Sequence, residues 1–150
     1  MEIQILPKGT TPPYSLLLLA DPSKQMIDDY LRDGYCYIAT IGQTLVGVLI
    51  LLKIESNILE IKNIAVAPDF QGKGYGKQLV RFAEKIARQQ GYQKLLIGTG
   101  NSSIGQLALY QKMGFEMDHL KKNFFIENYS EPIIENGIFC NHMVMLAKSL

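Results

Sequence analysis

Three glycines occupy alternate positions in the stretch "VAPDFQGKGYGKQLV", residues 66–80, between an apolar run and an amphipathic segment. Glycine has no Cβ atom, so it allows a sharp turn and lets another group approach the backbone amides. The segment after the glycines has one apolar stripe at helical spacing, formed by Leu79, Phe82, Ala83, Ile86 and Ala87. The stretch therefore predicts a strand, a tight turn and a helix N-terminus, whose partial positive charge suits an anion such as pyrophosphate.

Two common phosphate-binding motifs match this stretch only in part. The P-loop requires G-x-x-x-x-G-K-[ST], and no Gly-Lys pair here is followed by Ser or Thr. The dinucleotide motif requires G-x-G-x-x-G in a parallel β-α-β setting, whereas G-x-G-x-G here follows an expected antiparallel meander. We therefore exclude both motifs and keep two interpretations, an anion-binding turn and a glycine-rich connection without a ligand.

The hydrophobic spacing predicts the order β, α, α, β, β, β, α, β, α, β, β. The N-terminal half contains a strand at 2–6, two short helices between Pro12 and Gly34, and a three-stranded meander that turns at 42–43 and 56–57. The C-terminal half contains a short buried strand "KLLIGTG", a helix from Ser102 or Ser103 to Met113, and two closing strands in "FEMDHLKKNFFI" and "IFCNHMVMLAKSL". This order predicts an α/β fold with a mixed sheet and helices against its faces.

The third strand of the meander has an irregular apolar pattern. Apolar residues fall on odd positions at Leu59 and Ile61 but on even positions at Ile64 and Val66. Because alternate residues of a strand face opposite sides, we expect the register to slip near Asn63 through one extra residue, a β-bulge.

Length and charge limit the kind of protein. The chain has 150 residues, 47% of them apolar, which predicts one domain over residues 1–150. A formal net charge of +1 gives no broad attraction to nucleic acid or to an anionic membrane, so neither partner is expected. The N-terminus lacks a secretory signal pattern and no apolar run could span a bilayer, which predicts a cytoplasmic protein. Cys36 and Cys140 are expected to be buried, reduced thiols.

The segment Gln71-Gly72-Lys73-Gly74-Tyr75-Gly76 resembles the Q/R-x-x-G-x-G/A signature of the GNAT superfamily of acetyl-CoA-dependent N-acetyltransferases. The preceding "NIAVAPDF" and the later "LALYQKMGF" are similar to the adjoining segments of that family in type and order. The resemblance is strong from about Glu60 to Phe115 and looser, by strand order, over most of the chain. It implies a single GNAT-like domain with a mixed, mainly antiparallel central sheet of about seven strands, flanked by about four helices.

The resemblance also implies how acetyl-CoA, the co-substrate, would bind. The amides of the signature would hold its pyrophosphate, and the pantetheine arm would enter an opening between residues 64–66 and residues 95–98, where a main-chain amide would polarise the thioester carbonyl. Many relatives have an asparagine seven positions before the family tyrosine, where Ser103 stands here, and Asn101 lies nine before it. No metal is expected. The residues expected to bind the coenzyme are Ile64, Ala65, Val66, Gln71, Gly72, Lys73, Gly74, Tyr75, Gly76, Lys77, Asn101 and Ser103.

Tyr110 is the candidate general acid. It matches the family tyrosine that lies near the coenzyme sulfur, and its phenol, with an ordinary pKa near 10, would give a proton to the departing thiolate. The alternative is a tyrosine packed at the edge of the helix's apolar face.

Glu60 is the candidate base. It lies eleven positions before Gln71, where some family members carry a glutamate that removes the amine's proton through water. Lys62 is expected on the same strand face, so a solvent-exposed ion pair with Glu60 is the competing interpretation. His119 and His142 are further candidates for the base.

The leading hypothesis is an N-acetyltransferase that moves the acetyl group directly to a primary amine in a ternary complex. Glu127, Glu131 and Glu135, in the loop before the last strand, favour a small cationic amine, although a solvated acidic loop explains them as well. Tyr129 and the adjacent Ile133-Ile134 pair would cover the cleft or contact a second subunit of a homodimer. Two alternatives stay open, a non-catalytic acyl-CoA-binding regulatory module and an acetyltransferase for protein or peptide amines.

Overall fold

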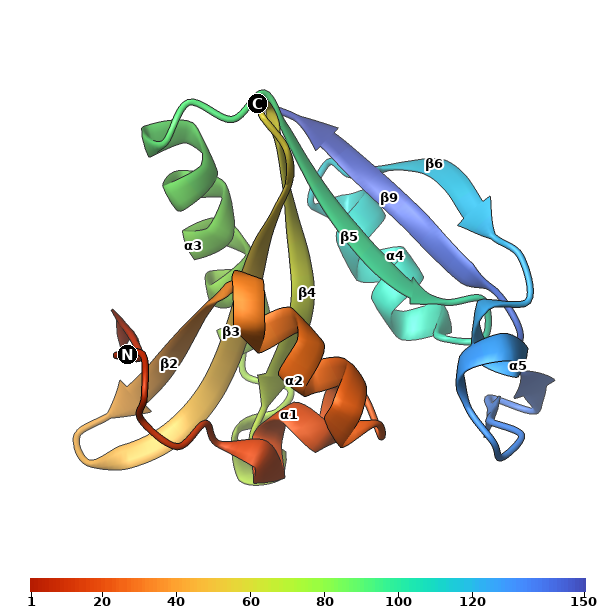
Figure 1. Ribbon diagram of the computed structural model, residues 1–150, viewed down its shortest axis with the longest axis horizontal. Coiled ribbons are helices and arrows are strands. Elements are labelled where there is room, and N and C mark those ends of the chain that lie inside the picture. The colour runs from red at the N-terminus through yellow and green to blue at the C-terminus, as the bar shows by residue number, and fades with distance from the viewer. The chain divides into compact units, whose positions relative to one another are not determined.

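The computed structural model describes residues 1–150 and divides into two compact units, residues 1–93 and residues 94–150 (Figure 1). The first unit contains β1 (Glu2–Ile5), α1 (Tyr14–Ala20), α2 (Lys24–Asp33), β2 (Tyr35–Ile41), β3 (Thr44–Glu55), β4 (Ile58–Val66), a 3-10 helix (Pro68–Phe70) and α3 (Tyr75–Gln89). The second contains β5 (Lys94–Gly100), α4 (Ile104–Lys112), β6 (Glu116–Lys121), α5 (Phe124–Asn128), β7 (Ile134–Glu135), β8 (Ile138–Phe139) and β9 (Met143–Ser149). A single domain over the whole chain stays a prediction.

In the first unit the strands pair in the order β1-β2-β3-β4, and every pairing is antiparallel. The register between β3 and β4 shifts at two places, between Lys53 and Glu55 and between Ile50 and Leu51. At the second, Leu51 pairs with Ile61 while Ile50 pairs with Asn63. Lys62 is therefore the extra residue of a β-bulge, and the slip predicted near Asn63 is confirmed. The bulge keeps the apolar residues on either side of it on one face of the sheet.

Helices cover both faces of this four-stranded sheet (Figure 1). The face that carries Gly47 packs against α3, since a Cβ atom added at Gly47 would lie 3.1 Å from Leu79 Cδ1. The other face packs against α1 and α2. Its buried cluster consists of Leu16, Leu17, Ile27, Cys36, Val48, Ile50 and Ala65.

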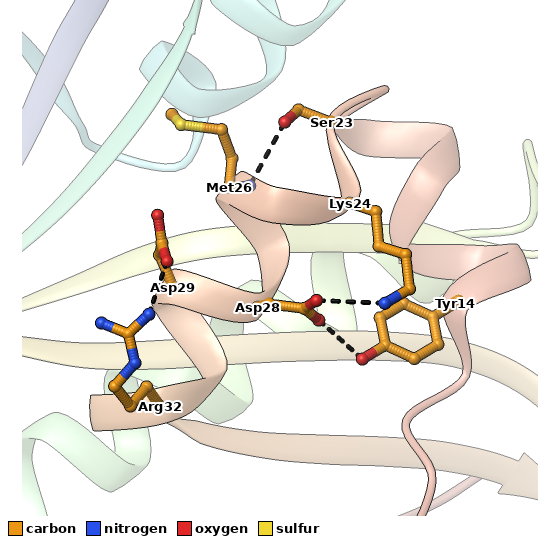
Figure 2. A network of polar contacts seen from close by, with 7 residues as sticks. All are labelled: Tyr14, Ser23, Lys24, Met26, Asp28, Asp29 and Arg32. Atoms are coloured by element: carbon orange, nitrogen blue, oxygen red, sulfur yellow. Dashed lines mark hydrogen bonds and ion pairs between the residues drawn. The ribbon is translucent and has the colours of Figure 1, made fainter.

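A polar network joins α1 to α2 (Figure 2). Tyr14 Oη donates to one carboxylate oxygen of Asp28 at 2.6 Å, and Lys24 Nζ lies 3.1 Å from the other. The hydrogen bonds from Tyr14 and Lys24 hold the pKa of Asp28 below its usual range. Ser23 caps α2 by accepting the Met26 N–H at 3.2 Å. The two helices that cover one face of the sheet are thereby held together.

In the second unit β5, β9 and β6 pair in that order, again antiparallel, and α4 lies beside them (Figure 1). The predicted number of seven main strands is confirmed, four in the first unit and three in the second. No helix in the structure is long and apolar enough to cross a membrane. Cys36 and Cys140 are buried and free, as expected.

The closing segment differs from the prediction of two plain strands. The run "FFI" belongs to α5, which begins after Asn123, whose φ of 60° turns the chain out of the extended course of β6. Ile138 and Phe139 pair with β7 in a separate hairpin, and β9 begins only at Met143. The hairpin turns at Asn136-Gly137, both with positive φ, and Asn-Gly is a pair that strongly favours such a turn.

Candidate functional site

The glycine turn leads from the end of β4 into α3. Gly72 and Gly74 have φ of +76° and +87°, in the left-handed region that other residues rarely adopt. Gly76 lies in the first turn of α3, and a Cβ atom added there would approach only Val66 Cγ2, at 4.0 Å. The backbone conformation therefore explains the first two glycines, while packing within the chain does not require the third.

The amides of this turn are available to a ligand. No backbone N–H from Gly72 to Lys77 donates a hydrogen bond within the chain, whereas the N–H groups of Gln71 and Gln78 donate to Pro68 O and Gly74 O. Gly74 is the N-cap of α3, no side chain caps the helix, and its first turn contains no acidic residue. The positive end of the helix dipole is therefore not compensated by the protein, an arrangement that suits an anion.

Gln71 fixes the point at which the turn leaves the sheet. Its Nε2 donates to Val66 O, the last carbonyl of β4, at 2.9 Å. Ala67 N–H donates to Val46 O of β3 at 2.9 Å, so the start of the connection is also bonded to the sheet. Lys73 Nζ lies over the Phe70 ring, 5.6 Å from its centroid. These contacts fix the start of the turn to the sheet and leave the N–H groups of residues 72–77 without a hydrogen-bond partner in the chain.

The residues expected beside the thioester, Ile64 to Val66, follow the bulge in β4. They pair on one side with Leu49, Val48 and Gly47 of β3. The expected opening between residues 64–66 and 95–98 involves both units and stays a prediction.

Glu60 and Lys62 form an ion pair in which Nζ lies 3.0 Å from Oε2. Only 7% of the Glu60 side chain and 15% of the Lys62 side chain are exposed, so the expectation of a solvent-exposed pair is wrong. The burial follows from the helices α1 and α2, which cover the face of the sheet that carries Glu60. Each buried charge depends on the other, since removing one partner leaves an uncompensated ion in the interior.

Two polar groups beside this pair were not among the predicted site residues. Burial, and then the nearby carboxylates of Asp21 and Glu60, raise the pKa of Tyr30 in α2 to about 12. Asn63 is 3% exposed; its Nδ2 donates to Leu17 O at 3.1 Å, while its Oδ1 has no hydrogen-bond partner. The sequence signal for Asn63 was a polar residue at the slip in an apolar strand.

Tyr110 lies in α4 of the second unit and is 6% exposed. Burial raises the pKa of its phenol to about 12. Its ring centroid lies 6.2 Å from that of Phe115, and its hydroxyl makes no hydrogen bond within the chain. The ring is thus held by packing while the hydroxyl stays available to another molecule.

Asn101 and Ser103 hold the segment that leads into β9. Asn101 Nδ2 donates to Phe139 O at 3.0 Å, and Asn101 Oδ1 accepts the N–H groups of Asn141 and His142 at 2.9 and 2.8 Å. Ser103 Oγ donates to a carboxylate oxygen of Glu135 at 2.7 Å. Asn101 keeps only one amide hydrogen for another partner, so these contacts favour a structural role. Binding of the coenzyme by either side chain stays a prediction.

The other candidate bases are both engaged in the second unit. His142 Nδ1 accepts the Asn123 N–H at 2.9 Å, and His119 Nδ1 lies 2.6 Å from an Asp118 carboxylate oxygen on an exposed strand. No group of three or more His, Cys, Asp or Glu side chains is placed to hold a metal ion. Among the candidate bases, only Glu60 is both buried and paired with a cationic side chain.

Comparison with known proteins extends the likeness of the turn to nearly the whole chain. Residues 6–115 match the model of the Acetyltransferase (GNAT) family. The uncharacterized N-acetyltransferase YvbK of Bacillus subtilis (strain 168) is 53% identical over 133 residues, which are 89% of this chain and 86% of that protein. A GNAT family acetyltransferase from Elizabethkingia anophelis, solved with acetyl-CoA bound, is 50% identical with a TM-score of 0.97, covering 99% of this chain and 97% of that one. The IAA acetyltransferase from Bacillus cereus ATCC 14579 is 48% identical with a TM-score of 0.95, covering 99% of each chain.

Proposed function

The chain belongs to the acetyltransferase (GNAT) family, and we propose that it transfers the acetyl group of acetyl-CoA directly to a small cationic primary amine. N-acetyl transfer is the activity of the family, and acetyl-CoA is bound in a structural neighbour that is 50% identical. The nature of the acceptor and the direct transfer are the proposal. Its main support is the run of backbone N–H groups from Gly72 to Lys77, at the uncapped start of α3, that donate no hydrogen bond within the chain.

These amides would donate to the diphosphate of acetyl-CoA. Charge-assisted hydrogen bonds from backbone N–H groups are stronger than neutral ones, and the α3 dipole adds to them. Lys73 and Lys77 are exposed and would add positive charge near the phosphates. Gln71 would act indirectly, by fixing the turn to the last carbonyl of β4.

The transfer itself needs a neutral amine and a stabilised leaving group. The amine nitrogen attacks the thioester carbonyl carbon, a C–N bond forms, the C–S bond breaks, and coenzyme A leaves as a thiolate. Glu60 would accept, directly or through water, the proton that the acceptor's ammonium must lose before its nitrogen can attack. The second proton, which the nitrogen loses as the amide forms, would pass through water to the departing thiolate. The Tyr110 O–H would donate a hydrogen bond to the sulfur, and the backbone N–H of Ile64 or Ala65 would donate one to the developing oxyanion.

The charges of the first unit support a cationic acceptor. The carboxylates of Asp21, Glu60 and Asp29 all act on Tyr30. Two of them already bind a cationic group, Glu60 the ammonium of Lys62 and Asp29 the guanidinium of Arg32. Glu135, which the acidic loop was expected to offer to the acceptor, instead accepts the hydroxyls of Ser102 and Ser103. We therefore place the attraction for the acceptor's charge beside Glu60 rather than in that loop.

An acceptor panel tests the proposal. Acetyl-CoA consumption is measured with spermidine, an aminoglycoside, lysine and a peptide with a free N-terminus. Initial rates are then measured while the concentrations of acetyl-CoA and of the amine are each varied. We expect turnover with a small cationic amine and intersecting reciprocal plots, as a ternary complex requires. Parallel plots would contradict direct transfer.

The same panel separates the alternatives. Tight binding of acetyl-CoA without turnover of any amine would identify a non-catalytic acyl-CoA-binding module. Turnover of the peptide alone would identify a protein or peptide acetyltransferase. A cytoplasmic location and a homodimer stay predictions that the panel does not address.

A further inference from the structure

We infer that the partly buried polar cluster of Tyr30, Glu60, Lys62 and Asn63 is the binding site for the acceptor's primary ammonium group, and that the Lys62 side chain occupies this site until the acceptor displaces it. The inference rests on the proposed function, because it locates the acceptor of the same reaction. We call these four residues the ammonium cluster.

The ammonium cluster already binds one ammonium group. Lys62 Nζ lies 3.0 Å from Glu60 Oε2 and 5.1 Å from the centroid of the Tyr30 ring. A carboxylate and the face of an aromatic ring are both groups that bind alkylammonium ions in proteins. Both charged side chains are mostly buried, so these contacts act with little screening by water.

One hydrogen-bond acceptor of the cluster has no donor. Asn63 Oδ1 is buried without a partner, and Asn63 lies on the same face of β4 as Glu60 because of the bulge between them. Glycine or an apolar residue would fill the position without this cost, so the orphan oxygen indicates a missing donor. A primary ammonium has three N–H donors and can reach a carboxylate and an amide oxygen together. The matching ligand is therefore a primary amine in its protonated form.

Lys62 is suited to exchange with such a ligand. It is the extra residue of the bulge, and its flexible stem can carry the ammonium outward, since part of the side chain already reaches solvent. If Lys62 leaves, Glu60 remains as a buried charge unless another cation replaces it. The exchange of one cation for another keeps the charge of the cluster constant, so neutral acceptors are disfavoured.

The Lys62→Met variant removes the internal cation and keeps an apolar stem. With a cationic amine from the acceptor panel, we expect the amine KM to fall by about fivefold or more, because the acceptor no longer competes with a tethered ammonium. The KM for acetyl-CoA should stay within about twofold. Lys62→Arg, the matched control, keeps a tethered cation and should leave the amine KM at or above the wild-type value. An unchanged or higher amine KM in Lys62→Met would overturn the inference.

The Asn63→Leu variant removes the orphan oxygen. Loss of one hydrogen bond to a charged group predicts an amine KM about tenfold higher, with the acetyl-CoA KM unchanged. The melting temperature should not fall, because the oxygen has no partner and Leu17 O still accepts the Asp21 N–H at 3.2 Å. A lower melting temperature with an unchanged amine KM would show a merely structural asparagine.

A third measurement needs no turnover. In protein labelled with 13C-lysine, the Lys62 Cε resonance is assigned by its loss in Lys62→Arg and followed as spermidine is added without acetyl-CoA. We expect the resonance to move to the value of exposed lysines, and to stay in place with tetramethylammonium, which has no N–H donor. If spermidine leaves it in place, the inference is wrong even where the enzyme is active. If it moves while no amine is acetylated, the cluster binds ammonium and the proposed function is wrong.

Discussion

Tyr110 shows how burial changes the chemistry of one residue. Its phenol has a pKa raised to about 12, so it stays neutral at any physiological pH and can donate a hydrogen bond. A thiol has an ordinary pKa near 8.5, so full proton transfer from this phenol to a thiolate is uphill by about 5 kcal/mol. Hydrogen-bond donation to the developing thiolate is therefore the role that its environment favours over complete transfer.

The Tyr110→Phe variant isolates this hydroxyl. We expect kcat to fall by about 100-fold, since the proposed hydrogen bond to the departing sulfur acts in the transition state, while the KM for acetyl-CoA changes by less than about twofold. The melting temperature should hold or rise, because the hydroxyl has no hydrogen bond to lose. Steady-state kinetics and thermal unfolding of the two proteins give both results. An unchanged kcat would support the alternative of a tyrosine that only packs.

The elements that the sequence predicted well are those with a long or regular pattern. The five-position stripe of α3 and the shift from odd to even positions in β4 located a helix and a bulge, because each pattern reports directly on which side is buried. The closing segment was misjudged because a five-residue helix and two-residue strands are too short for a period to show. Their positions depend on local turns and on the hydrogen bonds of Asn101. These bonds join Asn101 to residues that lie between 38 and 41 positions later in the sequence.

The β7–β8 hairpin provides a test at this scale. Glu135 accepts hydroxyls from Ser102 and Ser103, so Glu135→Ala should loosen the hairpin and speed hydrogen exchange of residues 134–142. The stability cost should be about 1 kcal/mol, since the carboxylate is exposed to competing water. The KM for a cationic amine should stay within about twofold. A large rise in that KM would show that Glu135 of the acidic loop does contribute to binding of the acceptor.

In the chain as a whole, the candidate site was predictable where its residues are consecutive. Residues 71–76 and Tyr110 could be proposed as candidates because short motifs carry them. The ammonium cluster could not, because Tyr30 reaches Lys62 only through the packing of α2 on the sheet, and an orphan oxygen is visible only in three dimensions. The competing interpretation of Glu60 was right about the ion pair with Lys62 and wrong about its exposure, since α1 and α2 cover that face.

Stability of the folded chain should fall at alkaline pH. Burial raises the pKa of Tyr110 to about 12 from an ordinary value of 10.0, so the unfolded chain releases this proton first. The contribution is fully present below pH 10 and is lost as the pH rises through 12, with about 1 kcal/mol gone near pH 11. Urea unfolding at pH 8 and pH 11 measures it, and Tyr110→Phe should lose less over this range. Equal losses in both proteins would contradict the assigned burial.

The binding of acetyl-CoA to Gly74→Glu, measured by calorimetry, tests the diphosphate site most directly. Gly91→Glu is the matched control, because Gly74 and Gly91 flank the two ends of α3, both have positive φ, and both have open space around an added Cβ atom. A carboxylate at the free amides should weaken acetyl-CoA binding by about 100-fold or more, while Gly91→Glu should change it by less than about threefold. Pantetheine, which lacks the diphosphate, should bind both variants like the wild type. Wild-type affinity for acetyl-CoA in Gly74→Glu would contradict the account.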